Sequence, residues 1–243
     1  MIPKIIHYCW LSNDPYPAKI QHCINSWKKK LPGYEIKLWN LQNFPLEKSE
    51  WVKQAFEAKK YAFAADYIRC YALYTYGGIY LDSDVEVLKK YDDLLGLPYF
   101  MCLENEQGAI EAATIGSEKG FEPFKLMLDY YDTHKFNLGN GKYDMTTIPV
   151  ILGKLLSTSF DVLRINNIEE FVNDKKLICL FPKDYFSPLV DDRLEYLTDN
   201  TYSIHHYTST WRPASHRLIR KIVLKVFGKR VKKILSVVYQ KIR

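Results

Sequence analysis

The chain has 243 residues and a net charge of +6, with 47% hydrophobic and 26% charged residues. These values are ordinary for a soluble globular protein that buries one substantial core. No apolar run approaches the roughly 18 residues of a membrane-spanning helix, and the N-terminus lacks the pattern of a signal peptide. Five scattered cysteines without a CxxC pair indicate packed, reduced thiols in a cytoplasmic protein rather than a zinc site.

The positive charge is concentrated at the C-terminus. Residues 212–243 contain 11 of the 34 Lys and Arg residues and no Asp or Glu. The remaining residues 1–211 therefore carry 23 basic and 28 acidic side chains, a net charge of −5. We expect one catalytic domain over 1–211 and a separate basic tail over 212–243.

Apolar patterns along the chain predict alternating strands and helices. Strands are expected at residues 5–10, 34–38, 79–81, 99–103 and 177–181. Helices are expected at residues 20–31, 50–76 (as two helices or one bent helix), 121–131 and 147–156. Gly77 and Gly78 are expected to end the helical segment 50–76. The polar, glycine-rich residues 132–147 are typical of a long loop. This alternation favours a layered α/β domain.

Two carboxylates, Asp82 and Asp84, follow directly after the short apolar run 79–81. Residues at i and i+2 on a strand share a face, so both side chains can reach one cation at the strand end. Carboxylate oxygens suit Mg²⁺ and Mn²⁺, which keep coordination positions for phosphate and water. Such an ion neutralises a departing diphosphate, although acidic turns after strands are also common without any function.

The preceding helical segment adds a second charged pair. Asp66 and Arg69 stand at i and i+3, on one face of the expected helix. They form either a surface ion pair of little energetic value or a pair that faces a donor sugar, in which Arg69 contacts sugar or phosphate.

These motifs together resemble glycosyltransferase family 32, which includes bacterial capsular-polysaccharide and Och1-type enzymes, with the clostridial glucosylating toxins as distant relatives. The matching segments are residues 2–10, 26–29, 34–40, 60–69, 77–85 and 205–211. The resemblance implies a GT-A fold and transfer with retention of configuration. It also implies a nucleotide-sugar donor, most often a UDP-hexose, and Mn²⁺ or Mg²⁺ as cofactor.

The resemblance assigns roles to individual residues. Asp66 and Arg69 match donor-sugar residues, and Asp82 and Asp84 match the DXD carboxylates, with Asp84 the more direct metal ligand and a catalytic residue together with Asp66 and Arg69. The other implied donor contacts are Trp10 on the base, Tyr80 on the donor and Trp211 near the leaving phosphate.

Two further pairs of residues are candidates for the metal site and the acceptor side. GT-A enzymes commonly complete the metal site with a late residue, so His205 or His206 is expected to bind the metal, and the sequence does not separate them. Glu104 and Asp144 are candidate acceptor-side carboxylates, with an ordinary loop position as the alternative. Here the chain departs from its relatives, because residues 147–149 read Thr-Ile-Pro where many relatives have Thr-Gly-Pro.

The basic tail has apolar residues at helical spacing, with Lys and Arg between them. This pattern predicts an amphipathic helix, either at an anionic membrane surface or packed on the catalytic domain. We expect no nucleic-acid partner. The sequence thus predicts a hexosyltransferase of capsule or exopolysaccharide synthesis that acts on a lipid-linked acceptor at the inner face of the plasma membrane. The alternatives are an inactive nucleotide- or sugar-binding GT-A domain and a haloacid-dehalogenase-type phosphatase.

Overall fold

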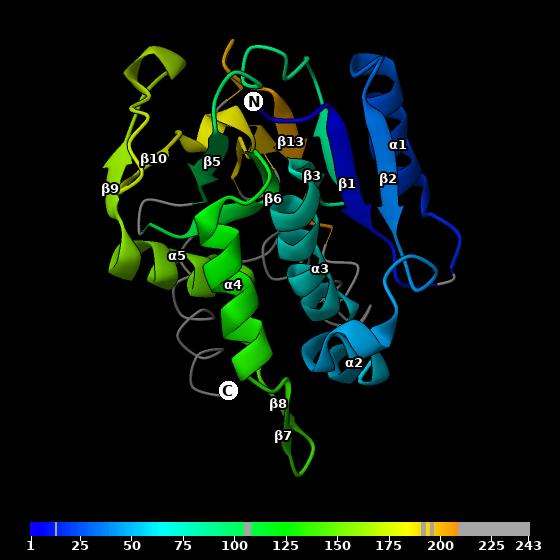
Figure 1. Ribbon diagram of the computed structural model, residues 1–243. Helices are drawn as coiled ribbons and strands as arrows, with labels where there is room; N and C mark the ends of the chain where they lie inside the picture. Colours follow the sequence, from blue (N-terminus) through cyan, green and yellow to red (C-terminus); the bar gives the residue numbers. More distant parts are fainter. Residues whose placement is uncertain (13, 105–107, 191–192, 195–196, 209–243) are drawn as a thin grey trace, which may run out of the picture.

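The computed structural model describes residues 1–12, 14–104, 108–190, 193–194 and 197–208 (Figure 1). Trp211 and the tail 212–243 lie outside the described residues, so the predictions made for them stay predictions. Among the described residues, no helix has both the length and the apolar character that crossing a bilayer requires.

A five-stranded mixed sheet forms the centre of the molecule, in the order β2-β1-β3-β6-β5. Its strands are β1 (Ile5–Cys9), β2 (Glu35–Trp39), β3 (Gly78–Leu81), β5 (Tyr99–Leu103) and β6 (Ile110–Ser117). Strand β1 runs parallel to both β2 and β3, whereas β6 is antiparallel to β3 and to β5. Four of these strands were predicted, and β6 was not.

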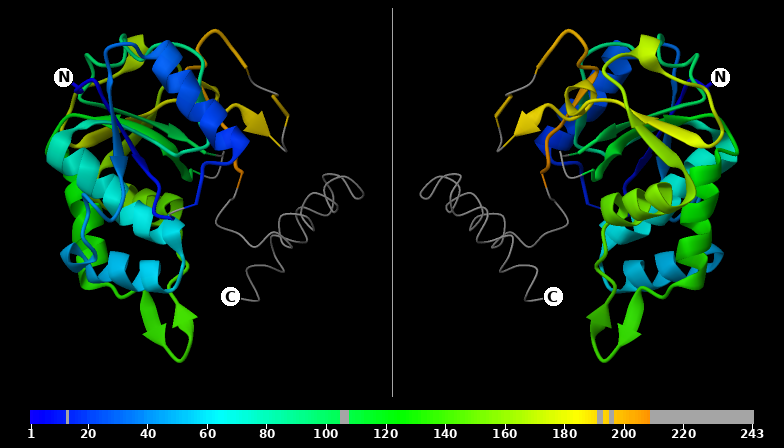
Figure 2. Two further views of the ribbon diagram at one scale, coloured as in Figure 1. Left: turned by 90° about the vertical axis from the view of Figure 1, so that its right-hand side faces the viewer. Right: turned by 90° about the vertical axis from the view of Figure 1, so that its left-hand side faces the viewer.

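Helices cover both faces of this sheet. They are α1 (Ala18–Lys30), α2 (Glu50–Glu57), α3 (Tyr61–Tyr76), α4 (Glu122–Thr133) and α5 (Ile148–Ser159). Helices α3 and α4 lie side by side on one face (Figure 1), and α1 lies on the other (Figure 2). Two hydrophobic cores lie on opposite faces of the sheet, and alternate residues of β3 contribute to each. Tyr80 belongs to the core with α3 and α4, while Ile79 and Leu81 belong to the core with α1. The predicted α/β class is confirmed.

Shorter strands surround the central sheet. Strand β4 (Val85–Val87) pairs antiparallel with β13 (Ser203–His205), and we call this pair the β4–β13 ribbon. Strands β9 (Asp161–Arg164) and β10 (Leu177–Leu180) form a parallel pair, and β11 (Leu189–Val190) and β12 (Arg193–Leu194) form an antiparallel one. All five cysteine thiols are free and buried, as the sequence predicted.

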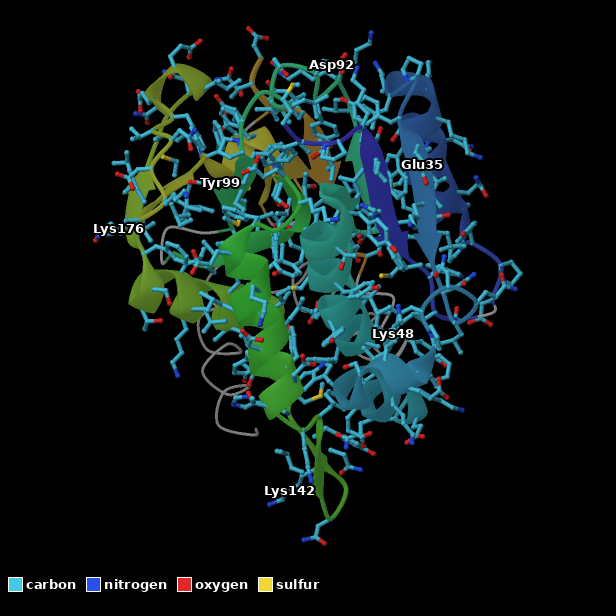
Figure 3. The ribbon with its side chains drawn as sticks, in the orientation of Figure 1. Glu35, Lys48, Asp92, Tyr99, Lys142 and Lys176 are labelled. Carbon is cyan, nitrogen blue, oxygen red and sulfur yellow. The ribbon has the colours of Figure 1, made fainter. Side chains whose placement is uncertain are left out.

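The prediction of a long loop over residues 132–147 was wrong in part. Residues Asn137–Gly139 (β7) and Lys142–Tyr143 (β8) form a hairpin that projects from the end of the molecule near α2 and α4, with Lys142 on it (Figure 3). The turn between them holds Asn140 at φ 51° and Gly141 at φ 73°. Positive φ angles at such residues are typical of tight hairpin turns, so the polar, glycine-rich composition marked a turn rather than an irregular loop.

Gly77 and Gly78 connect α3 to β3 at a point where the backbone is crowded. Both have positive φ angles, 67° and 106°. A Cβ atom at Gly77 would lie 2.7 Å from the Lys119 backbone nitrogen, and one at Gly78 would lie 2.6 Å from the Ile5 carbonyl oxygen. Glycine is required here both for conformation and for space, and the turn fixes where β3 begins.

The parallel strands β1 and β3 place their carboxyl ends at one edge of the sheet. Trp10 follows β1 and Asp82 follows β3, with β2 on the far side of β1. Ligands of open α/β sheets bind outside the carboxyl ends of strands at such a change of strand order. The candidate site is therefore expected at this edge.

Candidate DXD site

Arg69 is the buried centre of the site, between two carboxylates. Its Nη2 atom lies 2.9 Å from Asp82 Oδ1 and 3.4 Å from Asp66 Oδ1. Its Nη1 atom donates to the Ala112 carbonyl oxygen at 2.6 Å. The Arg69 side chain is only 5% exposed, so the pair predicted on one face of α3 is not a surface ion pair. It joins α3 to the end of β3.

Tyr80 contacts both Arg69 and Asp82. The Arg69 guanidinium lies 4.3 Å from the centre of the Tyr80 ring, a cation–π distance. The Tyr80 hydroxyl donates to Asp82 Oδ1 at 3.1 Å. Tyr80 is buried, and it contacts the site through the Arg69 guanidinium and the Asp82 carboxylate.

Asp66 is held by groups from two helices. In addition to Arg69, it accepts a hydrogen bond from the backbone N–H of Ile148, in the first turn of α5. Burial raises the pKa of Asp66 to about 7, against the opposing attraction of Arg69. A carboxyl group with a pKa in this range exchanges between accepting and donating hydrogen bonds near neutral pH.

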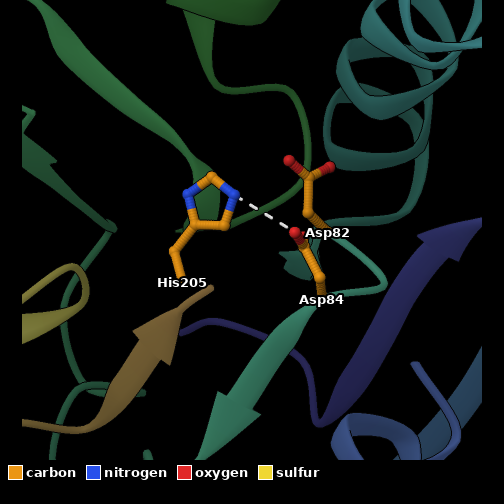
Figure 4. A group of neighbouring side chains, drawn as sticks. All are labelled: Asp82, Asp84 and His205. Atoms are coloured by element: carbon orange, nitrogen blue, oxygen red, sulfur yellow. Dashed lines mark ion pairs between the residues drawn. The ribbon is translucent and has the colours of Figure 1, made fainter. Parts of the chain in front are cut away.

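The β4–β13 ribbon brings His205 to the DXD carboxylates. His205 pairs with Val85, one residue after Asp84. Its Nε2 atom lies 3.5 Å from Asp84 Oδ1, the ion pair drawn in Figure 4. One ligand atom from each of Asp82, Asp84 and His205 lies within 4.8 Å of the others. Asp82 and Asp84, in the turn between β3 and β4, thus converge with His205 of β13 on one point.

Asp84 is fixed in place by more than the histidine. The backbone N–H and the hydroxyl of Thr208 both donate to Asp84 Oδ2, each at 2.8 Å. Although burial opposes the charged form, His205 and these hydrogen bonds hold the pKa of Asp84 well below its usual range. Asp84 is therefore an ionised carboxylate with one oxygen, Oδ1, directed towards the imidazole.

His206, the next residue, faces away from this cluster. Its Nε2 atom lies 2.8 Å from Glu86 Oε2. His22 Nε2 lies 3.1 Å from the other Glu86 oxygen, and Lys19 Nζ lies 3.7 Å from Oε2. The structure therefore distinguishes the two candidate histidines by position, with His205 at the DXD carboxylates and His206 in an ion pair with Glu86 near α1.

Glu111, on β6, is a functional candidate that the sequence reasoning missed. It is 2% exposed, and its Oε1 atom lies 3.2 Å from His205 Nδ1. It also accepts from the Ala113 backbone N–H at 2.7 Å and from the Tyr207 hydroxyl at 3.0 Å. Against the effect of burial, His205 and these donors lower the pKa of Glu111. The one available signal was an acidic residue in the otherwise apolar or small-residue run 110–116.

The protonation state of His205 follows from its two carboxylate neighbours. Burial alone would favour the neutral imidazole, but Glu111 and Asp84 outweigh it and raise the pKa of His205 well above its usual range. A positive charge is thus favoured between these carboxylates. A divalent cation supplies the same charge, and two carboxylates with one imidazole are a suitable donor set for Mn²⁺ or Mg²⁺. The residues present fit such an ion.

Three further predicted residues, Trp10, Glu104 and Asp144, lie outside the group that converges with His205. Trp10, at the carboxyl end of β1, is partly exposed, and its indole contacts Tyr16 edge-on at 5.0 Å. Glu104 follows β5, and burial together with the charge of Glu111 raises its pKa to about 7. Asp144 instead accepts from the Thr146 backbone N–H at 2.9 Å, which closes its own turn.

An α/β sheet with two carboxylates, Asp82 and Asp84, directly after an inner strand is the arrangement expected of a DXD glycosyltransferase. Residues 17–101 match the family model described as the glycosyltransferase sugar-binding region containing the DXD motif. The chain carries this region, and the predicted likeness to family-32 glycosyltransferases is confirmed.

Individual relatives agree with this class. Inositol phosphoceramide mannosyltransferase 3 of Schizosaccharomyces pombe is 34% identical over 131 residues, which are 52% of this chain and 36% of that protein. An uncharacterized glycosyltransferase of Acanthamoeba polyphaga mimivirus is 28% identical over 227 residues, 88% of this chain and 85% of that protein. The chain therefore spans little more than a third of the mannosyltransferase but most of the viral protein.

Among solved structures, a glycosyltransferase involved in the glycosylation of the major capsid of PBCV-1 aligns with a TM-score of 0.45 and 14% identity. The alignment covers 89% of this chain and 98% of that one.

Proposed function

We propose that the protein transfers a hexose from a nucleotide-sugar to a saccharide or lipid-linked acceptor, with a divalent cation held by Asp82, Asp84 and His205. The observation that carries this proposal is the convergence of these three side chains within 4.8 Å at the carboxyl edge of the sheet. Bound there, Mn²⁺ or Mg²⁺ supplies the positive charge that stabilises the departing diphosphate.

The two DXD carboxylates have different parts in this proposal. Asp84 is ionised and aimed by Thr208, so it is the direct ligand. Asp82 Oδ1 already accepts from Arg69 and Tyr80, so Asp82 links the cation to Arg69 through its carboxylate. His205 rather than His206 completes the donor set, because Glu86 holds His206 on the other side of the ribbon.

Donor recognition follows from the residues next to the cation site. Asp66, joined to Arg69, accepts from sugar hydroxyl groups, and Arg69 donates to the sugar or the phosphate. Trp10 stands at the same carboxyl edge and offers its indole face to a nucleotide base. Retention of configuration is proposed through front-face displacement, in which the leaving phosphate assists the incoming hydroxyl and no protein nucleophile takes part.

The proposal also includes an acceptor side and a cellular context. Glu104 is the preferred acceptor-side carboxylate, because it neighbours Glu111 and has a pKa near neutrality, whereas Asp144 is engaged in its own turn. The Schizosaccharomyces pombe relative is named an inositol phosphoceramide mannosyltransferase, which agrees with a lipid-linked acceptor. A role in capsule or exopolysaccharide synthesis at the inner membrane surface, with residues 212–243 on anionic lipid, completes the proposal.

The donor proposal is tested by incubating the protein with Mn²⁺ and a panel of UDP- and GDP-sugars. We expect one nucleotide to raise the unfolding temperature only when metal is present, and that donor to be hydrolysed slowly. Asp84→Asn should abolish both effects. Stabilisation that survives this substitution would reject the metal site, and metal-dependent binding without hydrolysis or transfer would indicate an inactive binding domain.

The membrane proposal is tested separately by flotation with anionic liposomes. The full chain should float with the liposomes, and a chain that ends at residue 212 should not. Equal flotation of the two chains rejects a membrane role for the tail.

A further inference from the structure

Glu111 is a buried carboxylate that the proposed donor chemistry does not use. It is the second residue of β6, next to the DXD strand in the sheet. Buried carboxylates are costly unless they are paired and hydrogen-bonded. Glu111 meets this condition through the Ala113 N–H, the Tyr207 hydroxyl and His205 Nδ1. Its position is therefore built into the fold.

These contacts leave Glu111 little freedom to turn. Oε1 receives the Ala113 N–H and faces His205, whereas Oε2 receives the Tyr207 hydroxyl. The Tyr207 hydroxyl lies 2.6 Å from Ser187 Oγ, and the Tyr207 ring lies 3.9 Å from the His205 ring. The imidazole is consequently held between Glu111 on its Nδ1 side and Asp84 on its Nε2 side.

We infer that Glu111 is the positioning residue of the cation site: it holds the His205 imidazole with Nδ1 towards Oε1, so that Nε2 faces the proposed cation position beside Asp84. A histidine ligand needs one nitrogen free of its proton, and a hydrogen bond at the other nitrogen selects that tautomer and orients the ring. This inference rests on the proposed function, because it assumes that a cation binds beside Asp84.

Glu86, on β4, provides a matched control. It also pairs a carboxylate with a histidine, Oε2 to His206 Nε2 at 2.8 Å. However, His206 is not among the residues that converge on the DXD point. Removal of the Glu86 charge therefore changes a carboxylate–histidine contact without touching the proposed cation ligands.

The test is the dissociation constant for Mn²⁺, measured by isothermal titration on the full chain without donor. We expect Glu111→Leu to raise this constant by about 10- to 100-fold, the usual effect of losing such a partner. Glu111→Gln should give a smaller rise, because its amide oxygen can still face Nδ1 as Oε1 does at 3.2 Å. Glu86→Gln should match the wild type.

The possible outcomes distinguish failure of the Glu111 positioning role from failure of the proposed metal-dependent function. If the wild type does not bind Mn²⁺, the metal-dependent function fails. If the wild type binds and Glu111→Leu binds equally well, only the positioning role fails. Should Glu111→Leu not fold, as judged by circular dichroism of the metal-free protein, Glu111→Gln decides: a weaker Mn²⁺ affinity supports the role, and an unchanged affinity overturns it.

Discussion

His205, the last residue of β13, and His206, the next residue, lie in different environments on two sides of the β4–β13 ribbon. On the inner face, His205 lies between Asp84 and Glu111, and all three side chains are at most 13% exposed. On the outer face, His206 pairs with Glu86, which is 22% exposed and also contacts the half-exposed His22. Neighbours along a strand point to opposite faces, so one step in sequence separates the two sites.

The difference shows that burial, rather than residue type, decides what a carboxylate–histidine pair does. Two buried carboxylates require a compensating cation, whereas a solvated pair contributes little. His7 completes the comparison as a buried histidine that pairs with no carboxylate among the residues that the structure describes. Its nitrogens contact the Gly77 carbonyl oxygen and the Trp39 indole, and burial lowers its pKa to about 4.

The largest expected effect comes from removing the buried Arg69 guanidinium, which pairs with Asp66 and Asp82 beside the inner face. Arg69→Met leaves Asp66 and Asp82 without their shared partner and should lower the free energy of unfolding by about 3–5 kcal/mol. Donor-dependent stabilisation should be lost as well. Urea unfolding measures the first effect, with Lys125→Met, at an exposed i,i+4 pair with Asp129, as control. A loss below about 1 kcal/mol would mean that the pair is solvated.

The next effect concerns the buried histidine His7. The pKa of His7 falls from its usual 6.5 to about 4 in the folded chain, so the unfolded chain binds the extra proton between these values. Stability from this group is therefore present above pH 6.5 and lost as the pH falls towards 4, by about 3 kcal/mol.

Urea unfolding at pH 7 and pH 4.5 measures this loss. His7→Gln retains hydrogen-bonding groups but cannot titrate, so its stability should fall less between the two pH values. If the variant and the wild type lose the same free energy, His7 is not a neutral buried histidine.

A smaller effect is expected from the residue that aims Asp84. Thr208→Val removes one of the two Thr208 hydrogen bonds to Asp84 Oδ2 and keeps the backbone N–H. We expect a loss of about 1 kcal/mol of stability and a modest weakening of Mn²⁺ binding. Thr208→Ser, which retains the hydroxyl, should behave as wild type, and equal losses in both variants would assign the effect to packing instead.

The smallest effect belongs to the outer face. Glu86→Gln should change the free energy of unfolding by no more than about 1 kcal/mol, because its ion pairs are partly solvated. Adding 0.5 M NaCl should reduce even this difference, since salt screens exposed charges. A larger change that salt does not alter would show that the outer face is as tightly coupled as the inner one.

The sequence was sufficient for the parts of the site that lie close together in the chain. Asp82 and Asp84 follow an apolar strand, and the Asp66–Arg69 spacing places both on one face of α3. These features depend on local periodicity, and the structure has them in the expected elements. The same holds for the glycine pair that ends α3.

Glu111 and the choice of histidine depend on contacts between distant segments. Strand β6 mixes a glutamate with small residues, so it lacks the apolar pattern that marks β3 and β5. Its register beside β3, and that of β13 beside β4, brings Glu111 and His205 together across 94 positions of sequence. Nothing local to His205 and His206 indicates which of them faces inward.

Parallel Mn²⁺ titrations of His205→Ala and His206→Ala test the central claim most directly. Both variants remove one imidazole from adjacent positions of the same ribbon. We predict that His205→Ala weakens Mn²⁺ binding at least about tenfold, as expected for a lost ligand, and that His206→Ala binds as the wild type does. Equal affinities in the two variants, or a loss confined to His206→Ala, would contradict a cation site formed by Asp82, Asp84 and His205.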